Sequence, residues 1–305
     1  MAKEKSLSVL DNVGDYILHH ISNSSLDKDL ILELPTVFGI NLSVTKHVLM
    51  IWLTSLIVAL IVIIPTRIFL KSKNEVPTGI SNGIEAIVSF IKDSIVKPNI
   101  GSKWSDTWSP LILTYFFFIL VANGIGLIPI FDFIGASSRF LFGINYGENS
   151  FANKLLHGGA TATGNFWVTS ALSTITFVSI IIAGTRAHGF INHWKNLVPK
   201  GLAWPVYIIL IPIEIIGMFV KPFALTMRLA ANMAGGHIAI LAILSFIAIF
   251  AEVFQTSVAG FGIAFFAVPL VSAITGLEII VTLVQAYVFT LLSAVFIGMA
   301  INVHH

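Results

Sequence analysis

The chain has no cysteine and few charged residues, and both absences exclude classes of protein. Of its 305 residues only 10% are charged while 56% are hydrophobic, and the mean hydropathy is +0.92. A soluble domain of this composition would expose too much apolar surface to water. Without cysteine the chain forms no disulfide and no cysteine-ligated metal site. The sequence therefore predicts an all-α polytopic membrane protein.

The net charge is also small, at +2. It suggests neither a nucleic-acid partner nor an acidic substrate, so the basic residues are interpreted as topology signals. We expect no metal and no other cofactor. Residues 1–46 contain acids and no continuous apolar core, which predicts neither a signal peptide nor a transit peptide.

Long apolar runs predict about five membrane crossings within a single membrane domain, residues 47–305. About 20 apolar residues in a helix span the ~30 Å of hydrocarbon in a bilayer. An amphipathic helix with isoleucines at helical spacing is expected to lie on the membrane surface. The expected spans are about 47–70, 109–130, 166–184, 205–250 and 254–302, the surface helix is about 79–98, and a polar loop, 131–165, has no assigned role.

The last two apolar runs are each about twice as long as a bilayer is thick. Each is therefore either a helical hairpin or one steeply inclined helix. Gly235 and Gly236 are the obvious break in the first run, but the piece after them is marginal for a span. We favour a final hairpin of two long, steeply inclined helices joined near Glu252.

Basic clusters at 67–73, 92–103 and 186–200 all fall on one side of the five expected crossings. The positive-inside rule makes that side the cytoplasm. Residues 1–46 are then an extracytoplasmic segment, and the C-terminus is cytoplasmic.

Arg228 lies inside an apolar run, where an arginine costs roughly 2.5 to 3.5 kcal/mol on insertion scales. Glu214, Lys221 and Arg228 are spaced by seven residues and Asn232 follows one turn later, so the four share one helical stripe. An internal salt bridge of structural use only is the alternative to a functional role.

The last helix carries a second polar stripe, which is either a packing seam or a water-filled path, and both readings stay open. His237 titrates near neutral pH whereas arginine stays charged, which is typical of proton-transfer machinery, although a lone membrane histidine is more often a packing residue. The stripe consists of Thr275, Glu278, Thr282 and Gln285. A further stripe in the third span, Asn165, Thr169, Ser173 and Thr176, is interpreted as packing on neighbouring helices.

Two segments, RLAANMAGGH at 228–237 and EIIVTLVQAYVF at 278–289, closely resemble subunit a of the rotary F-type ATP synthases. The resemblance implies a non-catalytic stator subunit of a bacterial plasma membrane, with two aqueous half-channels that carry protons to and from a rotating ring of c subunits. It also implies peripheral-stalk b subunits, the soluble catalytic head and membrane lipid as partners.

The resemblance further assigns residues. Arg228 matches the essential arginine of the family, and Asn232 and Gln285 match its asparagine and glutamine. Glu214 matches an acidic residue on the cytoplasmic side. His237 and Glu278 stand where many bacterial members have Glu and then His, which suggests that the two act as a pair.

The chain departs from the pattern at the outer proton entrance. Gly126 stands where some members carry an acidic residue, so Asp132 or the loop is expected to serve instead.

Two rival functions are a secondary transporter with an anion site at Arg228 and a structural membrane scaffold. The sequence shows no internal repeat and no helix break around Arg228, which argues against the transporter. A scaffold would not need two polar stripes.

Overall fold

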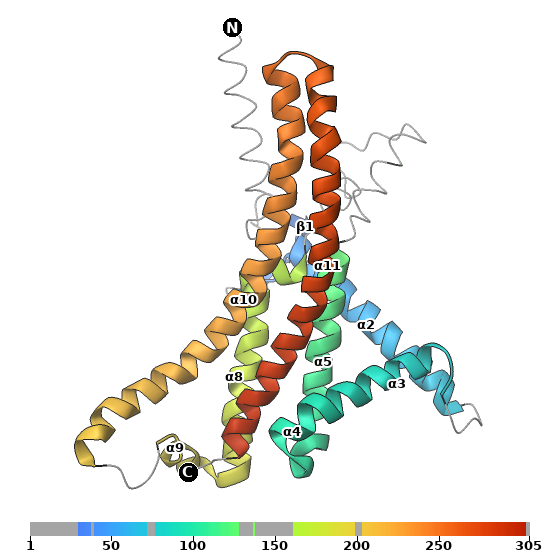
Figure 1. Cartoon of the computed structure of the whole chain (residues 1–305). Coiled ribbons are helices and arrows are strands. Elements are labelled where there is room, and N and C mark those ends of the chain that lie inside the picture. The colour runs from blue at the N-terminus through green and yellow to red at the C-terminus, as the bar shows by residue number, and fades with distance from the viewer. Residues whose placement is uncertain are drawn as a thin grey trace. The chain divides into compact units, whose positions relative to one another are not determined.

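The computed structural model describes residues 30–37, 40–71, 77–127, 137, 161–198 and 203–302 (Figure 1). Five helices within these residues are long and apolar enough to cross a membrane. They are α2 (Lys46–Lys71), α5 (Ser102–Leu127), α8 (Phe166–His188), α10 (Trp204–Val253) and α11 (Ser257–Ile301). The prediction of an all-α polytopic membrane protein is confirmed. Asp132 lies outside the described residues, and so does most of the polar loop.

The two longest helices are continuous (Figure 1). Helix α10 runs for 50 residues through Gly235 and Gly236, and α11 runs for 45 residues. The alternative in which each run is a hairpin is therefore wrong. The turn between them includes Gln255 at a φ of 50°. A β carbon on Gly260 would meet the side chain of Ala251, so the two helices approach closely near this turn. Their steep inclination in a bilayer stays a prediction.

The expected surface helix consists of three consecutive pieces, α3 (Ile80–Ile91), the π-helical turn η1 (Lys92–Val96) and α4 (Lys97–Ile100). Its apolar side is buried at Ile91, Ile95 and Ile100. On the other side the Lys92 ammonium lies 2.8 Å from the Asp106 carboxylate. The amphipathic pattern is thus confirmed, and its location on a membrane surface stays a prediction.

A short β-hairpin, which no sequence pattern predicts, precedes the first membrane helix. Strands β1 (Leu30–Leu32) and β4 (Val44–Thr45) pair antiparallel, and between them β2 (Thr36–Val37) pairs antiparallel with β3 (Ile40–Asn41). The remainder of the predicted extracytoplasmic segment, residues 1–29, lies outside the described residues.

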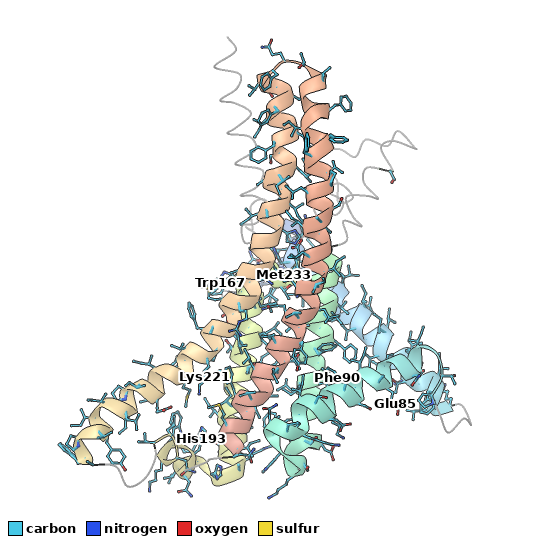
Figure 2. All side chains as sticks on the ribbon, viewed as in Figure 1. Glu85, Phe90, Trp167, His193, Lys221 and Met233 are labelled. Atoms are coloured by element: carbon cyan, nitrogen blue, oxygen red, sulfur yellow. The ribbon has the colours of Figure 1, made fainter. Side chains whose placement is uncertain are left out.

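The chain folds as two compact units, which divide α2, α5, α10 and α11 between them. One comprises Met1–Leu53, Ala122–Asn165 and Ala230–Leu283, and the other comprises Thr54–Val121, Phe166–Leu229 and Val284–His305. The hydrophobic core of the second unit joins α5, α8 and the end of α11 with the surface helix. Phe90 of α3, for example, stacks on Tyr287 of α11 with ring centroids 6.2 Å apart (Figure 2). The single domain over 47–305 stays a prediction.

A sharp corner follows α8. Gly189 has a φ of 85°, in the left-handed region that favours glycine, and starts the short helix α9 (Phe190–Lys195). The His193 ring of α9 (Figure 2) covers Gly184 of α8 so closely that a β carbon there would overlap it. Burial, and secondarily the nearby His188, lower the pKa of His193. Both effects favour the neutral form of the imidazole that packs against Gly184.

Two kinds of contact fix the C-terminal end of α11. The side-chain amide of Asn302 donates to the backbone carbonyls of Asn99 and Ile100, 3.2 and 3.4 Å away, at the end of α4. Gly298 faces the Asn99 carbonyl at a distance that leaves no room for a β carbon. The end of α11 and the surface helix are therefore in direct backbone contact.

We predict that Gly298→Ala lowers the thermal stability of the purified chain, because the new methyl group overlaps a backbone carbonyl that cannot rotate away. Overpacking of this kind costs about 1–3 kcal/mol. Gly262→Ala on the same helix is the matched control, since a β carbon there meets nothing within 4 Å. It should be neutral or stabilising by up to about 1 kcal/mol. Circular dichroism melts in detergent measure both, and equal shifts of the same sign would contradict the contact.

Candidate functional site

Arg228 lies on the exposed side of α10, and the opposite side of the helix is buried. Leu225 and Leu229 are 1% and 0% exposed, and Thr226 is 2% exposed. Ala224 and Met227 are exposed beside Arg228. The six successive positions 224–229 therefore define a packed side and an outward side, and Arg228 is on the outward one.

The predicted stripe of Glu214, Lys221 and Arg228 contains no internal salt bridge. Among the described residues no ion pair joins these three side chains. Lys221 instead lies over the ring of Phe296 of α11, with its ammonium 5.7 Å from the ring centroid (Figure 2). A cation at this distance from an aromatic face is stabilised without a carboxylate. Within the described residues, an internal salt bridge therefore does not explain why an arginine is placed at position 228.

His237 and Glu278 belong to the first unit, and both lie beside glycines. The Thr161 hydroxyl is 2.8 Å from His237 Nε2. A β carbon on Gly236 would overlap the Glu278 carboxylate, so this carboxylate lies directly over the residue that precedes His237. Glu278 is 4% exposed. The structure thus places the Glu278 carboxylate of α11 against α10 at the residue that precedes His237.

Three polar residues of the same unit were missed by the sequence analysis. Thr161, Thr163 and Asn123 are all buried. The Thr163 hydroxyl donates to Oδ1 of the Asn123 side chain. Thr161 fills the space beside Gly126, where a β carbon would overlap its side chain. An acidic side chain would not fit at position 126 in this arrangement.

The polar stripe of α11 faces the protein interior. Glu278, Thr282 and Gln285 are buried, whereas Leu277 and Ile280 on another face are 62% and 66% exposed. Both Glu278 oxygens, the Thr282 hydroxyl and the Gln285 amide nitrogen have no hydrogen-bond partner within the described part of the chain. Buried polar groups in proteins are nearly always hydrogen-bonded. These side chains therefore do not form a packing seam in which each polar group is hydrogen-bonded to its neighbour.

The other predicted site residue, Asn232, is exposed one helical turn after Arg228. The predicted roles of all six residues stay predictions. No group of three or more histidine, aspartate or glutamate side chains within the described residues is arranged to hold a metal ion.

The sequence matches known proteins over most of its length. The model of the family described as ATP synthase A chain matches residues 48–298. Similar proteins include ATP synthase subunit a 2 of Chlorobium luteolum, 39% identical over 95% of this chain and 76% of that protein. ATP synthase subunit a 2 of Chlorobaculum tepidum is 40% identical over 94% and 73% of the two chains. ATP synthase subunit a 2 of Prosthecochloris aestuarii is 36% identical over 95% and 80%.

The polar stripe of α11 can be tested by labelling, because the chain has no other cysteine. Single cysteines at Thr275, Glu278, Thr282 and Gln285 should react quickly with small water-soluble thiol reagents in membranes if the stripe lines an aqueous path. A thiol reaches its reactive thiolate form only where water or positive charge stabilises it.

Cysteines at Leu277, Ile280 and Val284 are the matched controls on another face of the same helix. They should meet lipid or another apolar surface and react slowly. Uniform labelling, or labelling strongest at Leu277 and Val284, would reject the aqueous path and leave Glu278 as a packing residue.

Proposed function

The chain belongs to the ATP synthase A chain family, whose members are the proton-channel stator subunit of F-type ATP synthase, and we propose that six of its residues carry the protons. The burial of a carboxyl group without a fixed hydrogen-bond partner, directly over the helix that carries His237, is the observation that supports this most. The residues are Glu214, Arg228, Asn232, His237, Glu278 and Gln285.

The partner of the exposed side of α10 is proposed to be a rotating ring of c subunits. Near Arg228 this side is apolar, with Val220, Phe223 and Met227 at 51%, 55% and 41% exposed. An apolar surface with one permanent cation suits a ring of apolar helices that each carry one carboxylate. Peripheral-stalk b subunits and the soluble catalytic head complete the proposed complex, and ATP is made in the head, so this subunit is not catalytic.

The outer half-channel is proposed to lead to His237 and Glu278, with Asn232 and Gln285 holding water along it. The hydroxyl of Thr161, in contact with His237, supports a route from the outer end of α5. Asn123 and Thr163 extend this polar group. We propose that Thr161 takes the place of the acidic residue that some relatives have where this chain has Gly126.

The ring carboxylate is the carrier in this proposal. Once it accepts a proton it is neutral and can enter lipid, which an ionised carboxylate could not do cheaply. After nearly a full rotation it releases the proton into the inner half-channel, near Glu214.

Arg228 separates the two paths. Its guanidinium favours the ionised ring carboxylate as it passes and repels any proton that would cross directly between the half-channels. An arginine at this depth is therefore retained because a carboxylate must arrive there without its proton.

The chain is proposed to lie in a bacterial plasma membrane with its N-terminus outside. The basic residues at the end of α2, in the surface helix and at the α8 corner then all face the cytoplasm, as the positive-inside rule requires. Arg67, Lys97 and Arg186 mark these three positions.

Copurification distinguishes the proposal from its two rivals. A mild-detergent preparation of the tagged chain should bring down a ring of small hairpin subunits together with a soluble ATPase head. Finding neither would favour a self-contained transporter or a membrane scaffold.

We predict that Arg228→Ala abolishes proton-driven ATP synthesis while the complex still assembles, because the charge that keeps the half-channels apart is gone. Arg228→Lys should fail or nearly fail, since a point ammonium on a flexible stem does not reproduce the planar fork. Membrane vesicles energised by respiration measure the synthesis, and subunit content measures assembly. Normal ATP synthesis with Arg228→Ala would contradict the proposed role of Arg228.

We also predict that His237→Glu and Glu278→His each impair ATP-driven proton pumping more than the double exchange does. Only the double variant keeps one acid and one imidazole in the pair. Quenching of a pH-sensitive dye in membrane vesicles measures the pumping. A defect in the double variant equal to the sum of the two single defects would show that the residues act independently.

A further inference from the structure

One buried polar contact joins α8 to α10 close to Arg228. The hydroxyl oxygens of Ser173 and Thr226 are 2.5 Å apart, and both side chains are 2% exposed. On α10 the neighbouring buried residues are apolar, whereas α8 also buries Thr169 and Thr176. Leu225 and Leu229 are buried on the same side of α10. The ring centroids of Phe177 and Phe219 are 5.3 Å apart, one turn along α8 from Ser173 and two turns along α10 from Thr226.

Each hydroxyl of this pair also reaches a carbonyl on its own helix. Ser173 donates to Ser170 at 3.0 Å, and Thr226 donates to Pro222 at 3.1 Å. A hydroxyl has one proton, so one member donates to the other and the second donates to its own carbonyl. Removal of either hydroxyl therefore leaves the remaining one with a partner, and no buried polar group is orphaned.

This arrangement affects the alignment of α10 on α8 more than the stability of the fold. A serine or threonine hydroxyl that donates to the carbonyl one turn earlier in its own helix keeps this bond at any position of the helix along its neighbour. The bond between the helices exists in one register only. Thr226 therefore contributes little that is needed for folding but does favour one alignment of α10 on α8.

We propose that the Ser173–Thr226 pair is a positioning device that fixes the height and rotation of α10, and hence of Arg228, against α8. The proposal rests on the proposed role of Arg228 as the barrier between the half-channels. In a membrane, van der Waals packing and hydrogen bonds between helices drive their association, and only the hydrogen bond ties one atom pair to one alignment. A single buried polar residue in an apolar helix seam is a well-attested means of fixing register.

The geometry explains why the register matters at this point. Thr226 precedes Arg228 by two residues, about 200° around the helix at ~3.6 residues per turn. Holding Thr226 against α8 therefore turns Arg228 away from it. A slip of one turn would move the guanidinium about 5.4 Å along the helix axis, more than the reach of a hydrogen bond.

The test uses the assembled complex with Thr226→Val, which removes the hydroxyl and keeps the branched shape. We expect normal amounts of the subunit in the complex and an altered ion path. ATP-driven pumping should fall and passive proton leak through the membrane sector in vesicles should rise, each about two- to tenfold, the range expected when one hydrogen bond no longer favours a register. Thr226→Ser keeps the hydroxyl and should restore both values.

Thr290→Val is the matched control. Thr290 is fully buried in α11, and its hydroxyl donates to the Ala286 carbonyl of its own helix. This variant should leave pumping and leak unchanged, which separates loss of the bond between helices from loss of a buried hydroxyl. Equal effects of Thr226→Val and Thr290→Val, or a defect in Thr226→Ser as large as in Thr226→Val, would overturn the proposal.

Ser173→Ala removes the same bond from the other side, while Thr226 keeps the Pro222 carbonyl. It should reproduce the phenotype, and the double variant should be no worse than either single one. Failure of both single variants to assemble would overturn the proposal, because the pair would then be needed for folding. Arg228→Ala in the same assays tests the barrier itself. A leak with Arg228→Ala but none with Thr226→Val would reject the positioning pair and leave the proposed function intact.

Discussion

A permanent positive charge on an apolar helix is the constraint on which the rest of this structure depends. Arginine cannot shed its proton at any physiological pH, so the chain must give Arg228 a surface where its charge is useful and keep it off the packed side of α10. Leu225 and Leu229 supply the apolar burial that turns the helix, and Thr226 adds a directional contact to α8. Residues 225–229 therefore carry the positive charge, the apolar packing and the hydrogen bond that together orient α10 on α8.

Glycine recurs at four places where a polar group lies against a helix. Gly236 receives the Glu278 carboxylate, Gly126 receives Thr161, and Gly184 receives the His193 ring. Gly298 in the same way faces a backbone carbonyl. Small residues let helices approach closely in a membrane, where packing rather than the hydrophobic effect holds them together. Here the same absence of a β carbon makes room for titratable and hydrogen-bonding groups.

The sequence predicted the membrane helices well because each is a long apolar run, and it predicted the polar side of α11 because the spacing of Glu278, Thr282 and Gln285 is helical. It did not predict the hairpin over residues 30–45, since strands of two or three residues carry almost no periodic signal. Thr161 was missed for another reason. It lies at the end of a loop, and its contact with His237 joins residues 76 positions apart in the chain, which no local pattern encodes.

The unpartnered atoms of α11 distinguish transport from scaffolding on physical grounds. A scaffold gains nothing from a buried carboxyl group, because an unsatisfied polar group in an apolar interior costs free energy and an apolar side chain of similar size would remove the cost. Within the described residues neither oxygen of Glu278 has a hydrogen-bond partner. Such a group can take up and release a proton without breaking a bond to the protein. The same feature that is unfavourable in a static seam is therefore what the proposed proton path would use.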